Sequence, residues 1–117
     1  MVNNLFLFFM FLIALSFNKA SAAELEYYWS GAVTKKSAVV CFATDSDAKI
    51  RVQYSDNINF RRNNLFSRTQ HCNSQSNYFS KIKLSSLKPE KTYYYRFSVD
   101  GIIDKNKTGK FQTHSSG

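Results

Sequence analysis

The sequence has 117 residues, a formal net charge of +8, two cysteines and only two histidines. At about 150 residues per domain, this length allows one domain and excludes stand-alone enzymes built on large α/β scaffolds. The 44% apolar and 16% aromatic content is enough to bury a core, which excludes a disordered chain. His71 and His114 belong to no cluster of ligand-type residues, whereas a zinc or binuclear centre needs three or four converging ligands per ion. We therefore expect no catalytic residue, no metal site and no cofactor in this chain.

An apolar segment opens the chain. The thirteen residues from Leu5 to Phe17 include twelve apolar ones, whereas a membrane-spanning helix needs about 20. The small residues Ala20-Ser21-Ala22 follow, and an apolar run of this length before an A-x-A site is typical of a secretory signal peptide. We predict cleavage between Ala22 and Ala23. No Lys or Arg precedes the apolar run, which departs from the usual pattern and leaves an uncleaved anchor as the alternative.

Cleavage there divides the chain into three parts. Residues 1–22 form the signal peptide, residues 23–113 one folded domain, and residues 114–117 a tail or the start of a linker. The mature chain loses Lys19 and no acidic residue, so 95 residues with a net charge of +7 remain. We expect an exported protein, periplasmic or extracellular, with no stable membrane span after cleavage.

The mature chain carries strand patterns throughout. No run has apolar residues at i, i+3, i+4 and i+7, so we predict no helix. Seven short segments instead show period-two alternation or β-branched and aromatic runs, separated by turn signals. They span residues 24–33, 37–44, 49–54, 65–69, 78–84, 92–99 and 107–113. This pattern predicts an all-β fold, a seven-stranded antiparallel sandwich.

The segment LKPEKTY carries the most specific signal. Pro89 lacks an N–H and fixes its own φ, so it belongs in the turn between two strands. Leu87 can fill the end of the core before that turn. Tyr93 opens the next strand, where its ring can be buried while its hydroxyl reaches the backbone upstream. Leu87, Pro89 and Tyr93 therefore predict a tyrosine corner, the structural feature that fixes the crossover between two sheets.

This pattern resembles the fibronectin type III and immunoglobulin-like modules, which carry L-x-P-x-x-x-Y between two strands. A narrower resemblance rests on WSGAVT, SAVV, LKP, YYYRF and GKFQT, which occur in that order between residues 28 and 113. Together they resemble the N-terminal β-sandwich domain of PhoD-type alkaline phosphatases. In that family the sandwich precedes a metallophosphoesterase domain whose metal ligands lie downstream, so the resemblance transfers no catalytic residue to this chain.

The resemblance implies a function for the chain. It would be a non-catalytic structural and docking module whose partner is a phosphoesterase catalytic domain, in cis if the chain is a fragment. The alternatives of a truncated product and of a free-standing sandwich stay open. The second candidate function is a stand-alone secreted adhesion or ligand-binding sandwich.

Two other features have alternative interpretations. Cys41 and Cys72 are candidates for a disulfide, since export permits one, but Cys41 lies within a strand and Cys72 beside a loop. Otherwise Cys72 is a free thiol and Cys41 a small strand residue. Asn106-Lys107-Thr108 matches an N-glycosylation acceptor, which matters only in a eukaryotic secretory route.

The positive charge is spread over the chain. Lysines and arginines are scattered through predicted loops and strand faces rather than gathered in one run. Scattered charge is typical of a solvated surface, and we expect no nucleic-acid partner. Trp29 is interpreted as core or interdomain packing rather than as a platform for a ligand.

Overall fold

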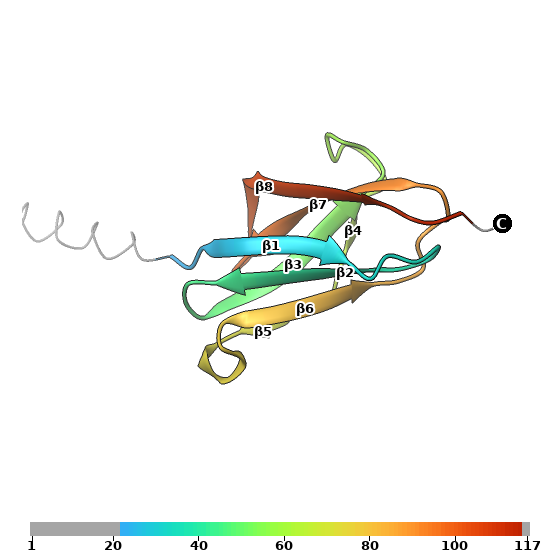
Figure 1. The fold of residues 1–117 in the computed structure, drawn as a ribbon. Coiled ribbons are helices and arrows are strands. Elements are labelled where there is room, and N and C mark those ends of the chain that lie inside the picture. The colour runs from blue at the N-terminus through green and yellow to red at the C-terminus, as the bar shows by residue number, and fades with distance from the viewer. Residues whose placement is uncertain (1–21, 116–117) are drawn as a thin grey trace, which may run out of the picture.

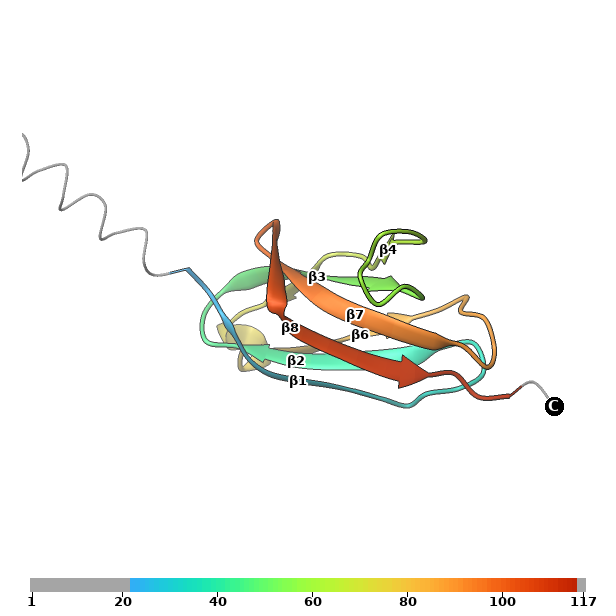
Figure 2. The same cartoon turned by 90° about the horizontal axis from the view of Figure 1, so that it is seen from above.

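The computed structural model describes residues 22–115, and nearly the whole predicted signal peptide lies outside this range. Eight strands and one short 3-10 turn make up the fold, and the two sheets lie face to face (Figures 1 and 2). The elements are β1 (Leu25–Gly31), β2 (Ala38–Thr44), β3 (Ala48–Ser55), β4 (Leu65–Phe66), β5 (Gln70–Cys72), η2 (Ser74–Ser76), β6 (Phe79–Leu84), β7 (Thr92–Val99) and β8 (Ile102–Gln112). Within the described residues no helix is long and apolar enough to cross a membrane.

All strand pairs are antiparallel. One sheet has three strands in the order β1-β2-β6, and the other has the order β4-β3-β7-β8, with β5 also paired to β3. The predicted all-β antiparallel sandwich is therefore confirmed, with eight strands instead of seven. The neighbours of β2 are β1 and β6, which are the first and the fifth of the predicted segments.

The additional strand is β5, which lies just beyond the segment predicted as one strand over residues 65–69. Within that segment only Leu65 and Phe66 form a strand, which is β4. Phe66 pairs with Gln53 and Gln70 pairs with Ile50. The chain therefore advances by four residues from Phe66 to Gln70 while β3 advances by only three, which is a β-bulge. The bulge centres on buried Ser67, whose hydroxyl accepts a hydrogen bond from the Val52 N–H at 2.9 Å. Bulges of this kind interrupt a ladder locally. Here the bulge ends β4 after Phe66 and separates it from β5, a strand that the sequence pattern did not predict.

The core lies between the sheets. Its largest fully buried side chains include Phe42 from the three-stranded sheet and Phe97 and Ile50 from the other. Alternation in β7 places Tyr93, Tyr95 and Phe97 inward at 6%, 2% and 0% exposure, because successive strand side chains point to opposite faces. Residues 22–115 thus contain a closed core of their own, which is what an independently folding domain requires.

Candidate functional site

The tyrosine corner lies between β6 and β7. The phenolic oxygen of Tyr93 accepts a hydrogen bond from the backbone N–H of Lys88 at 2.9 Å. The ring of Tyr93 stacks on Phe111 of β8 with centroids 5.7 Å apart. Leu87 is 4% exposed, its N–H donates to the carbonyl of Lys36, and Pro89 follows in the turn. The corner therefore joins the loop after β6, strand β7 and strand β8 at one end of the sandwich.

The chain leaves the fold at the same end. The hydroxyl of buried Thr113 donates to the Lys88 carbonyl at 2.6 Å and accepts from the Lys91 N–H at 2.9 Å. The N–H of His114 donates to the Thr34 carbonyl at 3.1 Å, and the His114 carbonyl accepts from the Glu90 N–H at 3.1 Å. We call this set of hydrogen bonds the exit clamp. Through it, residues 113 and 114 are attached both to the β1–β2 loop and to the corner.

An ion pair adds a third loop to this end. The Nζ of Lys91 lies 3.1 Å from the Oδ2 of Asp56, which belongs to the loop between β3 and β4. A hydrogen bond from the Asn63 side chain and the adjacent Lys91 ammonium lower the pKa of Asp56. The loop is also held by the Ser55 hydroxyl, which donates to the Arg62 carbonyl at 2.6 Å. A hollow lies between this loop and the corner, and its lining includes Asp56, Asn63, Lys88, Lys91 and Tyr93.

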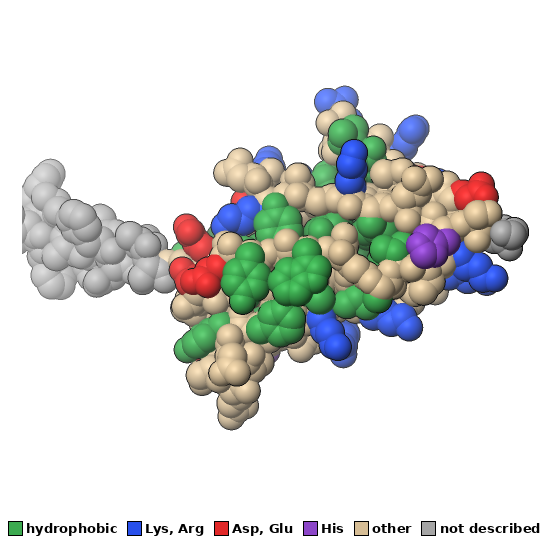
Figure 3. Space-filling model, in the orientation of Figure 1, with side chains coloured by type: hydrophobic (Ala, Val, Ile, Leu, Met, Phe, Trp, Pro, Cys, Tyr) green, Lys and Arg blue, Asp and Glu red, His purple; other side chains and the backbone are tan. Residues whose placement is uncertain are grey.

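A second candidate surface is the outer face of the three-stranded sheet. Tyr27 and Trp29 of β1 are 53% and 47% exposed, and their rings stack with centroids 6.0 Å apart and planes at 14°. The ring of Trp29 also packs against that of Phe79 of β6, with centroids 5.8 Å apart. We call Tyr27, Trp29 and Phe79 the aromatic patch, and it appears as a continuous apolar area in Figure 3. Trp29 was expected in the core or in interdomain packing, and within this sandwich it lies outside the core.

The two cysteines are free, so the candidate disulfide between Cys41 and Cys72 is absent. Cys41 is partly exposed in β2, between Trp29 of β1 and Lys81 of β6. Cys72 is fully buried in β5, which belongs to the other sheet. The two cysteines therefore lie in different sheets: Cys41 is on the outer face of the three-stranded sheet, and Cys72 faces the core from the other sheet. Burial raises the pKa of the Cys72 thiol.

The remaining sites of the sequence analysis are dispersed. Ala22 is exposed and Ala23 packs partly against the core, at the end of the sandwich opposite the exit clamp (Figure 1). Asn106 is exposed in β8. It is one of three extra residues, 105–107, that lie between Asp104, which pairs with Phe97, and Thr108, which pairs with Arg96. No group of three or more His, Cys, Asp or Glu side chains in residues 22–115 is placed to hold a metal ion.

Sequence reasoning missed the aromatic patch as a single surface. Its signal is the i, i+2 spacing of Tyr27 and Trp29, which puts both rings on one face of a strand. The contribution of Phe79 depends on the pairing of β1 and β6 with β2, and no local pattern reports that pairing.

Comparisons with known proteins agree with this architecture. Residues 28–115 match the PhoD-like phosphatase N-terminal domain family. A search of curated proteins found no match. Among solved structures, that of PhoD has a TM-score of 0.65 and 20% identity over 76% of this chain. The match covers 19% of the PhoD chain, so the present chain spans about a fifth of that protein.

Two further solved structures have the same fold. The sensor domain of the anti-sigma factor RsgI4 from Pseudobacteroides cellulosolvens has a TM-score of 0.60 and 16% identity, over 82% of this chain and 98% of that one. A redesigned β-sandwich protein has a TM-score of 0.54 and 19% identity, over 80% of this chain and 96% of that one. Identities at this level show the fold alone, whereas the family match covers most of the sequence. The chain therefore belongs to the family of N-terminal domains of PhoD-like phosphatases, as a non-catalytic β-sandwich module.

Proposed function

We propose that this module is exported and that it orients a phosphoesterase catalytic domain that follows it in cis. The observation that carries the proposal is the exit clamp. Thr113 and His114 are hydrogen-bonded to two separate loops, so the direction in which the chain leaves the sandwich is defined by the fold.

A defined exit direction matters for two linked domains. A flexible linker lets the second domain sample many orientations, whereas a chain fixed up to residue 114 transmits the orientation of the sandwich. Three loops surround the exit, the β1–β2 loop, the corner and the loop that carries Asp56. They offer a surface against which a following domain can pack, with polar side chains typical of interdomain contacts.

The presence of a following domain is tested by sequencing the DNA downstream of the Gly117 codon. An in-frame metallophosphoesterase coding region supports the proposal. A stop codon directly after Gly117 with no such region in frame contradicts it and favours a stand-alone adhesion or ligand-binding sandwich.

The orienting role is tested with Thr113→Val in the full-length protein. Valine keeps the shape of the side chain but removes the hydroxyl that joins Lys88 to Lys91. We expect faster protease cleavage after residue 113 and lower phosphatase activity, with the sandwich still folded. Thr108→Val is the matched control, because Thr108 is exposed in β8, the strand that ends just before Thr113. Equal cleavage rates and activities in both variants would contradict the orienting role.

The non-catalytic role is tested with a purified fragment of residues 23–117. We expect no turnover of phosphate monoesters or diesters with added calcium, iron or zinc. Metal-dependent turnover that a substitution within this domain abolishes would contradict the assignment.

Export is tested by N-terminal sequencing or intact mass of the secreted protein. We expect the mature chain to begin at Ala23 and to be found in the periplasm or outside the cell. A secreted or membrane-bound species that retains residues 5–17 would support the uncleaved anchor instead.

A further inference from the structure

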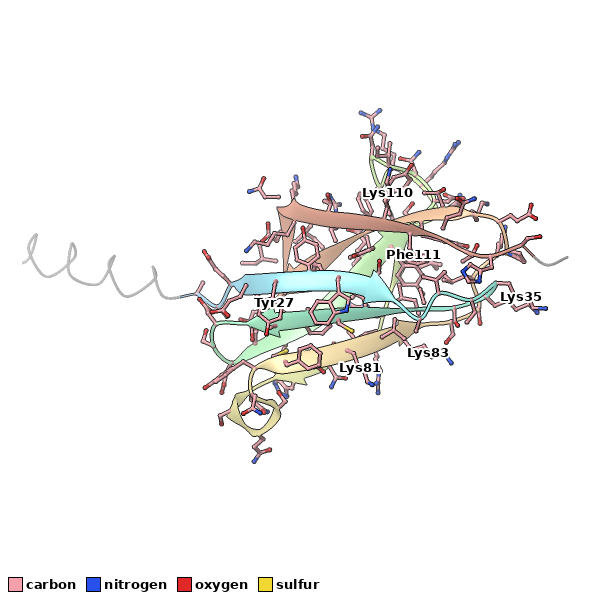
Figure 4. The ribbon with its side chains drawn as sticks, in the orientation of Figure 1. Tyr27, Lys35, Lys81, Lys83, Lys110 and Phe111 are labelled. Carbon is pink, nitrogen blue, oxygen red and sulfur yellow. The ribbon has the colours of Figure 1, made fainter. Side chains whose placement is uncertain are left out.

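The outer face of the three-stranded sheet is organised in three cross-strand rows. In the central row Trp29, Cys41 and Lys81 are paired across β1, β2 and β6. The row on one side contains Tyr27, Ala43 and Phe79, and the row on the other side contains Gly31, Val39 and Lys83. Figure 4 shows Tyr27 toward one end of this face and Lys83 toward the other.

The two flanking rows have complementary shapes. One presents two aromatic side chains, Tyr27 and Phe79, at the outer strands. The other presents open space at Gly31, where no atom lies within 4 Å of the place a Cβ would occupy, and the ammonium group of Lys83. A ring can occupy the open space over Gly31, and a cation over the face of a ring is a favourable arrangement.

The charges at the two ends of this face are also complementary. The end near Tyr27 is acidic, and the end near Gly31 leads into a lysine-bearing loop (Figure 3). The acidic group consists of Glu24, Glu26, Asp45 and Asp47, and the basic loop carries Lys35 and Lys36, all exposed. A surface with both signs disfavours a uniformly anionic polymer as its ligand. It matches a partner with the same two charges in reversed order.

We propose that this face binds a second copy of the chain, with a two-fold axis along the row of Trp29, Cys41 and Lys81. Such an isologous contact uses the same patch on both subunits. Rotation about this axis places Tyr27 over the partner's Gly31 and Phe79 over the partner's Lys83. It also places the acidic end of each copy over the Lys35–Lys36 loop of the other.

The axis brings each residue of the central row near its own equivalent. The two Trp29 rings can stack, and aromatic pairs add to the energy of apolar burial. The two Lys81 ammonium groups repel each other, but β6 is an edge strand and a lysine there can extend its charged end into water.

The size of the face sets the expected strength. Three strands about 4.8 Å apart, each about seven residues long at about 3.4 Å per residue, cover only about 350 Å² in outline. Stable dimers bury about 800 Å² per partner. We therefore expect a weak dimer, populated at high protein concentration and at low ionic strength.

The first test is sedimentation equilibrium of residues 23–117 at low salt, from about 10 μM to about 1 mM. We expect concentration-dependent dimers, and at least tenfold weaker association for Trp29→Ala. Phe66→Ala is the matched control, because Phe66 is an exposed aromatic of the other sheet, and it should leave association unchanged. A monomer over the whole range, or a dimer that survives Trp29→Ala, would overturn the proposal.

Charge reversal tests the orientation. Lys35→Glu with Lys36→Glu should abolish the dimer, and so should Glu24→Lys with Glu26→Lys. The four substitutions together should restore association toward the original level, because each end then meets its opposite again. Failure of the four-substitution variant to associate, with its fold intact by circular dichroism, would overturn the proposed orientation.

Cys41 provides a proximity probe in the intact exported protein. With a short bismaleimide, each Cys41 thiol adds across a maleimide C=C bond, forming an S–C bond while its proton goes to the adjacent carbon. We expect a covalent dimer that Cys41→Ser abolishes and that Cys72→Ser, which removes a fully buried thiol, does not. Absence of this cross-link would overturn the proposal for the intact protein, because an axis through the central row brings the two Cys41 thiols close together.

Discussion

The module has two aromatic clusters that differ in what their rings join. In the core, the ring of Phe97 from one sheet packs against the rings of Phe42 and Tyr28 from the other. The ring centroids are 5.8 Å and 5.1 Å apart, and the ring planes meet at 65° and 64°. Among residues 22–115, the rings of Tyr27, Trp29 and Phe79 in the aromatic patch contact only rings of their own sheet, with planes at 14° and 30°. The core rings therefore hold two sheets together, whereas the patch rings line one sheet and remain available to a partner. The same residue types serve folding in one place and recognition in the other.

The largest expected effect is loss of a core ring that also forms the corner. Tyr93→Ala should lower the free energy of unfolding by about 3–5 kcal/mol, because it removes the ring stacked on Phe111 and the acceptor for the Lys88 N–H. A small domain has only about 5–15 kcal/mol in total, so this variant should be close to unfolding. Chemical denaturation measures the change. Tyr27→Ala is the patch counterpart, and an equal loss there would remove the distinction between the clusters.

Overpacking under a core ring should have the next largest effect. A Cβ at position 109 would lie 2.3 Å from the Cζ of Tyr95, so Gly109→Ala should lower the free energy of unfolding by about 1–3 kcal/mol. Gly31→Ala is the matched control in β1, where a Cβ meets nothing within 4 Å. Thermal unfolding of the two variants tests this, and a Gly109→Ala midpoint at or above that of Gly31→Ala would contradict the close approach.

Removing the corner hydroxyl alone should have a smaller effect. Tyr93→Phe keeps the ring but leaves the Lys88 N–H without its acceptor, so we expect a loss of about 1 kcal/mol in the free energy of unfolding. Tyr94→Phe is the neighbouring control, on the opposite side of β7. Denaturant midpoints of the two variants should differ, and identical midpoints would mean that the corner depends on ring packing only.

The smallest stability effect is expected in the patch itself. Trp29→Ala should change the free energy of unfolding by no more than about 0.5 kcal/mol, as is usual for surface substitutions, while it weakens self-association at least tenfold. Unfolding is measured by denaturant at a protein concentration where the original chain is monomeric. A loss close to that of Tyr93→Ala would assign Trp29 a role in holding the sandwich together.

Much of the fold follows from local patterns. Alternation in YYYRFSV predicts which side chains enter the core, because strand side chains alternate between the two faces. Leu87, Pro89 and Tyr93 predict the corner because a proline turn and a strand-opening tyrosine act within seven residues. The family resemblance rests on the same short segments, and the match to residues 28–115 confirms it.

The features that local patterns did not reveal depend on contacts between distant segments. The bulge at Ser67 exists because β3 lies beside it, and three inserted residues in β8 are accommodated only against β7. Cys41 and Cys72 are kept apart by the assignment of their strands to different sheets. The exit clamp and the aromatic patch both assemble residues from elements far apart in the chain. Periodicity constrains a side chain relative to its own strand, but only tertiary pairing decides which other side chains it meets.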